Sequence, residues 1–223
     1  MKKVLRRLAT GMIFLLLSAC APQTDGPVKL SDKVKVTRLL VLPFRDMSAI
    51  YGKSHSALCP LCGQVFLTGE VQKNAVDFLS NNLTALLKSR TTFTVITDTR
   101  ADLFLSDLSA GATEKKSDRM LLMEAGRRAD ADAVLVGYIY RFRQRVGTSY
   151  ASDSPASVAF GLHLINIPDG RSLWAGKIDE TQHSLSHNLL EIGSFFKRGA
   201  KWVTSEDMAA SGLEKILKTF PNP

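Results

Sequence analysis

The order of the apolar segments is the sequence feature that most restricts the fold. Residues 38–44 form an apolar run that is too short for a helix and contains a proline near its end, which indicates a buried strand. Apolar residues at three- and four-residue spacing predict helices over 71–89, 117–129 and 205–219. Apolar or alternating runs predict further strands over 92–97, 131–143, 157–167 and 172–183.

These segments predict one α/β domain over residues 36–220. The front of the chain reads strand, helix, strand, helix, and such an order favours parallel strands joined by right-handed crossovers. The next three strands form a meander, with Pro168-Asp169-Gly170 as the turn between its last two members. We therefore expect a mixed, twisted sheet of five strands with helices packed on it. Ser117 and Ser205 are the expected N-caps, and residues 45–70 are expected to form a long irregular loop.

The N-terminus predicts export and a lipid anchor. Four basic residues (Lys2, Lys3, Arg6 and Arg7) precede a short apolar run over 8–17, the layout of a secretory signal. That run is too short to span a bilayer, which takes about 20 residues. Residues 17–20, Leu-Ser-Ala-Cys, resemble the bacterial lipobox, and this resemblance implies that residues 1–19 are removed and that Cys20 carries acyl chains such as palmitate. Several chains give stable anchoring where one is marginal.

The residues after Cys20 indicate a tether and a destination. Ala21 stands where an inner-membrane retention signal would have Asp, so the resemblance implies an outer-membrane lipoprotein facing the periplasm. Residues 20–35 are rich in small and polar residues and are expected to be flexible. Removing the signal takes four of the 29 basic residues and leaves 25 against 21 acidic ones, so the net charge falls from +8 to about +4. This mild excess does not favour nucleic acid as a partner.

Three segments in the predicted domain resemble a group of envelope lipoproteins. They are Leu-Pro-Phe at 42–44, Ala-Asp-Ala-Val-Leu-Val-Gly at 131–137, and the meander motif from Leu164 to Trp174. The group includes the curli-secretion lipoprotein, the activator lipoprotein of a penicillin-binding protein, and the N-terminal domain of the Tol-Pal propeller protein. The resemblance implies a non-enzymatic role in secretion, cell-wall synthesis or envelope maintenance. A self-inserted pore is a further alternative, for which the hairpin over 134–167, with its tip at 141–154, is the candidate barrel segment.

A cysteine pair, Cys59 and Cys62, is the main candidate for chemistry. In an oxidising compartment this spacing favours a structural disulfide that closes the long loop. A metal site is the next alternative, with His55 as a possible third ligand, because Cys-x-x-Cys-Gly is half of a zinc ribbon. Redox activity and two free thiols remain further alternatives, although the pair does not begin a helix as redox pairs usually do. We expect no cofactor and no resident metal.

A stretch near the C-terminus combines aromatic and basic residues. Phe195, Phe196, Lys197, Arg198 and Trp202 either belong to the core or form an exposed surface that docks on a partner or on anionic lipid. The histidines at 163, 183 and 187 are expected to be structural or surface residues. No catalytic triad order, phosphate-binding glycine loop or paired carboxylates can be recognised, so we expect neither an enzyme nor a small-molecule substrate.

Two hypotheses follow from the sequence. The first is a non-enzymatic envelope lipoprotein whose α/β domain binds a protein partner, or itself, in the periplasm. The alternative is a thiol-active or metal-binding envelope protein that works through Cys59 and Cys62.

Overall fold

The computed structural model describes residues 35–97, 117–147, 152–182 and 203–221. Its main sheet has the strand order β10-β9-β6-β1-β5, and a sixth strand, β2, pairs with β6. These strands are β1 (Arg38–Val41), β2 (Arg45–Asp46), β5 (Thr94–Ile96), β6 (Ala133–Arg143), β9 (Ser157–Asn166) and β10 (Ser172–Thr181). The four helices in the described residues are α2 (Ser48–Tyr51), α3 (Ala75–Arg90), α5 (Asp118–Arg128) and α7 (Ser205–Leu217).

The mixed α/β sheet predicted from the sequence is confirmed. β1 pairs in parallel with β5 and with β6, as the two helical crossovers require, and β6, β9 and β10 form an antiparallel meander. The strand count was too low by one. The additional strand, β2, has only two residues, and a pairing this short leaves no alternating pattern in the sequence.

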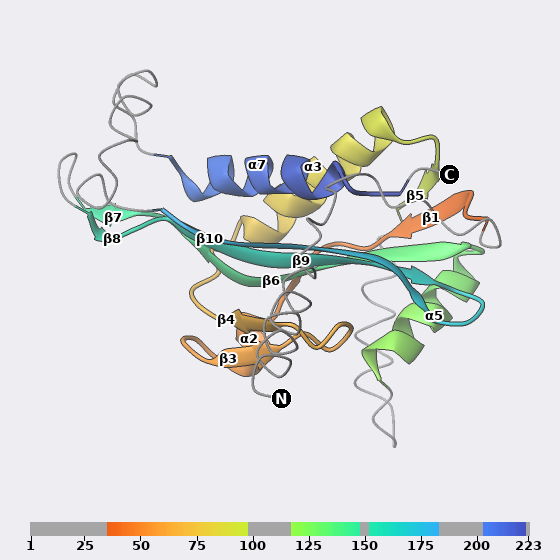
Figure 1. The fold of residues 1–223 in the computed structure, drawn as a ribbon, viewed down its shortest axis with the longest axis horizontal. Coiled ribbons are helices and arrows are strands. Elements are labelled where there is room, and N and C mark those ends of the chain that lie inside the picture. Colours follow the sequence, from red (N-terminus) through yellow and green to blue (C-terminus); the bar gives the residue numbers. More distant parts are fainter. Residues whose placement is uncertain (1–34, 98–116, 148–151, 183–202, 222–223) are drawn as a thin grey trace, which may run out of the picture.

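One face of the sheet lies under α3 and α7 (Figure 1). Leu79, Leu83 and Leu87 recur every four residues along α3 and are fully buried against this face. Burying each such side chain contributes about 1.5–3 kcal/mol. The final helix begins with a capping box, in which the Thr204 hydroxyl accepts from the Asp207 N–H and the Asp207 carboxylate accepts from the Thr204 N–H. Thr204 is therefore the N-cap, one residue before the predicted Ser205.

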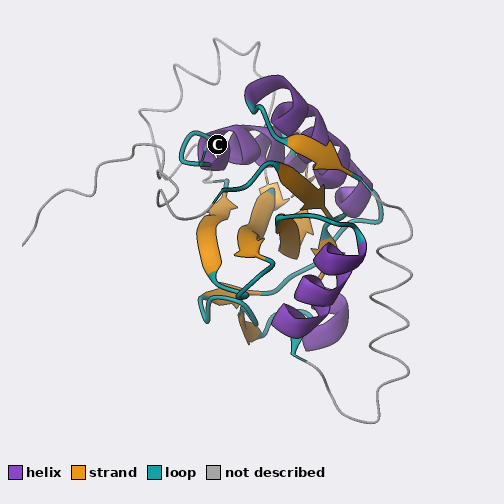
Figure 2. Ribbon diagram, turned by 90° about the vertical axis from the view of Figure 1, so that its right-hand side faces the viewer, coloured by secondary structure: helices purple, strands orange, loops and turns teal. Residues whose placement is uncertain are grey.

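The opposite face lies against α5 and against the segment that contains α2, β3 (Ser56–Leu58) and β4 (Val65–Leu67) (Figures 1 and 2). Ser117 caps α5 as predicted, because its side chain accepts from the Met120 N–H. Residues 45–70 are not the irregular loop that the sequence suggested. They hold β2, α2 and the β3–β4 hairpin, whose strands of three residues are shorter than the runs that reveal a strand in a sequence.

A break in the pairing of β6 with β9 decides where Arg141 lies. The register shifts between Ile139 and Arg141, a β-bulge, so Tyr140 and Arg141 both face the β3–β4 side. Arg141, where the predicted strand over 131–143 overlaps the predicted hairpin tip over 141–154, belongs to β6 and is buried. The tip itself carries two short strands, β7 (Val146–Gly147) and β8 (Ser152–Ser154).

Several expectations from the sequence lie outside the described residues. They are the signal and Cys20, the tether, His183, His187, and the aromatic and basic residues between 195 and 202. Among the helices that are described, none has the length and apolar character needed to cross a bilayer.

We expect Gly137→Ala to destabilise the domain. A Cβ atom at Gly137 would lie 2.3 Å from Cε1 of Phe44, whose ring is buried and packs edge-on against Phe160 with ring centroids 6.0 Å apart. Overpacking of this kind costs about 1–3 kcal/mol, measurable by denaturant unfolding. Phe44→Leu made in the Gly137→Ala background should cost less than it does alone. An unchanged stability for the single variant would show that the Phe44 ring can move aside.

Candidate functional site

A tight turn at the end of the β3–β4 hairpin presents the two cysteines. The Gly63 N–H donates to the Cys59 carbonyl at 2.9 Å, and the Cys59 N–H donates to the Gln64 carbonyl at 2.8 Å. Gly63 has φ +71°, a conformation that glycine adopts without the strain that other residues meet. Arg119 of α5 donates to the Leu61 carbonyl inside the turn at 2.9 Å and also to the Gly170 carbonyl. The turn is therefore attached to the body of the domain.

His163 comes from β9, in the interior of the main sheet. It lies opposite Val136 of β6 and Ala175 of β10 and is only 2% exposed. Alternation along β9 directs Ala159, His163 and Ile165 to the sheet face that the hairpin covers. Gly161 stands between them on the same face, and a Cβ there would lie 3.4 Å from Nε2 of His163 and from Phe66.

The cysteine turn and His163 meet in one cluster. Sγ of Cys59 lies 3.2 Å from Nε2 of His163 in a buried hydrogen bond. Sγ of Cys62 joins them, and the three atoms all lie within 4.8 Å of one another. Cys59 and His163 are buried, whereas Cys62 is exposed, so the cluster opens to solvent on one side. Two sulfur atoms and an imidazole nitrogen are a ligand set that thiophilic metal ions prefer.

The disulfide favoured by the sequence is not formed in this structure, where both cysteines are free thiols. The Cys59 sulfur is instead hydrogen-bonded to the His163 ring. His55, considered above as a third ligand, does not join the cluster, and its Nδ1 lies 2.7 Å from the Lys53 carbonyl. The third member is His163, which lies 104 residues along the chain from Cys59. Only the folded chain brings the two together.

The surroundings of Cys59 favour its thiolate. Burial raises the pKa of this thiol, but the His163 ring, the Tyr140 hydroxyl and the Leu61 backbone N–H favour the charged form and lower the pKa from 9.0 to about 6. The Tyr140 hydroxyl is buried and has no well-aligned partner among the described residues. Burial and the neighbouring Cys59 raise the pKa of Cys62. One sulfur of the pair is therefore ionised at neutral pH and the other remains a thiol.

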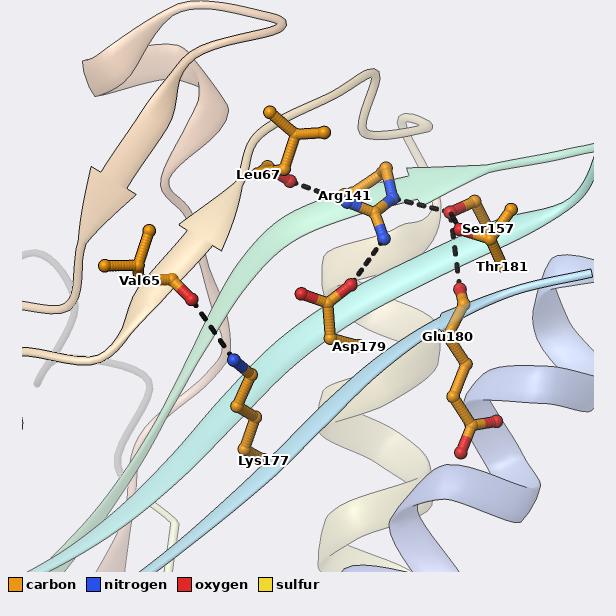
Figure 3. A network of polar contacts seen from close by, with 8 residues as sticks. All are labelled: Val65, Leu67, Arg141, Ser157, Lys177, Asp179, Glu180 and Thr181. Atoms are coloured by element: carbon orange, nitrogen blue, oxygen red, sulfur yellow. Dashed lines mark hydrogen bonds and ion pairs between the residues drawn. The ribbon is translucent and has the colours of Figure 1, made fainter.

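A polar network holds the hairpin on the sheet (Figure 3). Arg141 donates to the Leu67 carbonyl at 2.7 Å, to Ser157 at 2.5 Å and to Asp179 at 2.6 Å. Lys177 donates to the Val65 carbonyl at 3.1 Å, so side chains of β6 and β10 bond to both ends of β4. Arg141 is buried whereas Asp179 is partly exposed, and removing the partner of a buried charge is costly because it leaves that charge uncompensated. The network therefore fixes the cysteine turn above His163.

The hairpin packs one face inward and leaves an apolar face outward. Phe66 points inward and stacks on Tyr140, with ring centroids 4.0 Å apart and an interplanar angle of 6°. Leu58, Val65 and Leu67 alternate to the other side, and each is at least 55% exposed. Ile50 and Tyr51 of α2 are exposed as well, and the Tyr51 hydroxyl donates to the Leu58 carbonyl at 3.4 Å. These five residues are called the apolar hairpin face below.

Of the site residues expected from the sequence, the structure describes Cys59 and Cys62 and brings them together. Cys20, the lipidation site, and the aromatic and basic residues Phe195, Phe196, Lys197, Arg198 and Trp202 lie outside the described residues. Sequence reasoning missed His163 as a member of the cluster. The sequence does place His163 in an otherwise apolar strand. That position predicts that the ring is buried but does not identify the residues that cover it.

We expect the Cys59 thiolate to be lost as the pH falls through about 6, because its pKa is lowered to that value. Reduced, metal-free protein with Cys62→Ser isolates this group, and ultraviolet absorbance of the thiolate reports its titration. His163→Ala in the same background should move the midpoint upward, toward the ordinary value of 9.0. His55→Ala is the matched control and should leave the midpoint unchanged. A midpoint that is the same with and without the His163→Ala change would show that His163 does not lower the pKa of Cys59.

Comparisons with known proteins extend the fold assignment but name no family. No protein-family model matches the chain, and no curated protein sequence matches it. Among solved structures, the dodecamer of PelC from Paraburkholderia phytofirmans is similar with a TM-score of 0.50 and 12% identity, over 88% of this chain and 96% of that one. At this identity the likeness shows the fold alone.

Two further solved structures are similar at lower scores. Lipoprotein GNA1162 from Neisseria meningitidis has a TM-score of 0.40 and 13% identity, over 74% of this chain and 98% of its own. The C-terminal domain of LpoB from Escherichia coli has a TM-score of 0.38 and 15% identity, over 68% and 88% of the two chains. At these scores the two likenesses are similarities of fold and nothing more. The likeness to the curli-secretion and Tol-Pal proteins stays a prediction.

Proposed function

We propose that this chain is a non-enzymatic lipoprotein of the bacterial envelope whose domain associates with further copies of itself in the periplasm. The role would be that of an accessory in secretion, cell-wall synthesis or envelope maintenance. Two independent observations support this proposal. The lipobox ending at Cys20 supports the anchor, and Ala21 favours the outer membrane. The apolar hairpin face supports the association.

The apolar hairpin face is the observation that carries the proposal. Seven large hydrophobic side chains are exposed in the described residues, and five of them lie between residues 50 and 67. Scattered exposed hydrophobic residues need no explanation, but a group on one face marks an interaction site. The network around Arg141 and Lys177 holds this face rigid, so little side-chain or loop ordering would be needed on binding.

A second copy of the chain is the partner that this face fits best. The outward-facing residues of the β3–β4 hairpin are Ser56, Leu58, Val65 and Leu67, and none of them is charged. Such a surface can meet an identical one without repulsion between like charges. A face that meets its own copy closes as a two-fold pair. The similar fold of PelC was solved as a dodecamer, which supports an assembly of more than one copy as the form to test for.

We expect the lipid-anchored protein, extracted in mild detergent, to have the mass of two or more subunits. Light scattering with the detergent mass subtracted gives this value. Replacing Leu58 and Leu67 by serine should shift the mass to that of one chain, because both side chains are more than half exposed and contribute to the face rather than to the core.

Met120→Ser is the matched control, because Met120 is 56% exposed but lies on α5 and is not part of the apolar hairpin face. It should leave the assembly intact. A wild-type monomer at every concentration would overturn self-association, and an assembly that survives the double serine variant would remove the hairpin from the interface. Serine variants that lose only membrane contact would indicate that the face meets lipid instead.

We expect Cys20→Ser to abolish the anchor. The variant should incorporate no labelled fatty acid and should keep residues 1–19, because the thiol that receives the lipid is gone. Mass spectrometry of the isolated protein distinguishes the acylated mature form from the precursor. Cys59→Ser is the control for thiol-directed labelling and should be processed normally. A variant at Cys20 that is still cleaved and acylated would remove the lipobox assignment.

A second candidate function is thiol or metal chemistry at Cys59 and Cys62, and the contact with His163 specifically favours it. Replacing both cysteines by serine separates the two candidates. If the folded variant still assembles and the cell keeps its envelope phenotype, the first function is supported and the second is ruled out.

A further inference from the structure

The cluster of Cys59, Cys62 and His163 has the dimensions of a metal site. Zinc bound by sulfur at about 2.3 Å and by imidazole at about 2.0–2.1 Å in a tetrahedral site separates a sulfur from a nitrogen by about 3.5 Å and two sulfurs by about 3.8 Å. Cys59 Sγ and His163 Nε2 are 3.2 Å apart, and no pair of ligand atoms in the cluster exceeds 4.8 Å. A single ion could therefore reach all three atoms after side-chain movements of less than about 1 Å.

The backbone of the cysteine turn suits two negatively charged sulfurs. The Leu61 backbone N–H lowers the pKa of Cys59, and the Gln64 backbone N–H opposes the burial and the neighbouring Cys59 that together raise the pKa of Cys62. Each N–H lies two residues after the cysteine that it serves, so one tight turn supplies both donors. Hydrogen bonds of this kind stabilise thiolates, the form in which cysteine binds a metal.

The burial of His163 is otherwise unexplained. Its ring is 2% exposed, its Nε2 faces the Cys59 sulfur, and its Nδ1 has no hydrogen-bond partner among the described residues. Placing such a ring in the interior of a sheet has a cost that an apolar residue would avoid. The Cys59 thiol is the only polar group that contacts the ring in the described residues. A structural disulfide would not offset the cost of burying the ring, because the disulfide would replace that thiol. A bound metal ion would use the ring as a ligand.

We propose that Cys59, Cys62 and His163 bind one thiophilic d¹⁰ metal ion, Zn²⁺ or Cu⁺. Both thiolates and the Nε2 atom of His163 are the protein ligands. Because Cys62 is exposed, the remaining coordination position faces solvent, where a water molecule can complete a zinc site or can be absent from a three-coordinate copper site. The ion would link the β3–β4 hairpin to β9 and would thereby fix the apolar hairpin face on the sheet. The site itself does not depend on the proposed self-association.

Metal titration of the full lipid-anchored chain tests the site. The protein is extracted in mild detergent, reduced with a phosphine and freed of metal, and Zn²⁺ or Cu⁺ is added in competition with a chromophoric chelator. One equivalent per chain is expected. Co²⁺ added in place of zinc should give charge-transfer absorbance from thiolate to metal, which reports sulfur ligation directly. Competition between the two ions on one sample decides which of them the site prefers.

Variants decide whether these three residues are the ligands. Cys59→Ser, Cys62→Ser and His163→Ala should each weaken binding at least tenfold, and both serine variants should reduce the charge-transfer band. His55→Ala is the matched control from the same hairpin and should bind like the wild type. His163→Gln, which keeps a polar side chain of similar size, replaces His163→Ala if circular dichroism shows that the alanine variant is unfolded.

Three results would overturn the proposal. The first is reduced wild-type protein that binds neither ion with one-to-one stoichiometry. The second is binding that the cysteine variants leave intact, which would place the metal elsewhere. The third is a Cys59–Cys62 disulfide that is complete in protein taken directly from the envelope, because a disulfide and two thiolate ligands exclude each other.

Discussion

The central antiparallel pair, β6 with β9, is the constraint on which the rest of this structure depends. Ten of the eleven residues of β6 and all ten of β9 are buried, so both faces of the pair must be covered. α3 and α7 cover one face. The other face is wider than α5 alone covers, and the segment over 45–67 completes it with α2 and the β3–β4 hairpin. This requirement places the cysteine turn directly over β9, and therefore over His163.

The polar groups at this second face follow from the same packing. The bulge in β6 puts Tyr140 and Arg141 next to each other on the hairpin side, where Phe66 stacks on the ring and β4 accepts from the guanidinium. Lys177 of β10 adds a further contact, with its Nζ atom 4.5 Å from the centre of the Phe66 ring. The hairpin is short, and two strands alone are marginally stable in water. Its order depends on these contacts with the sheet.

One short segment thus presents two different surfaces. Its inward side supplies Cys59 and Phe66 to the sheet, and its outward side supplies Leu58, Val65 and Leu67 to solvent. The alternation of a strand produces this division, because neighbouring residues point to opposite faces. A metal ion on the inward side and a subunit on the outward side would not compete for space. Loss of the ion would still affect the outward side, since the cysteine turn joins the two strands whose outward residues form it.

The sequence determined the architecture because its long segments carry period-specific patterns. The continuous apolar runs of β6 and β9, the four-residue spacing of Leu79, Leu83 and Leu87, and the Pro168-Asp169-Gly170 turn each indicate one local structure, and the folded chain has all of them. The Cys59 and Cys62 spacing likewise marked a site.

Tertiary structure alone decided what that site contains. His163 lies 104 residues from Cys59, a bulge between Ile139 and Arg141 puts Tyr140 and Arg141 on the same side of the sheet, and β3 and β4 are too short to have a period. Local patterns record which face of a strand is buried, whereas the identity of its covering partner depends on how the whole chain packs.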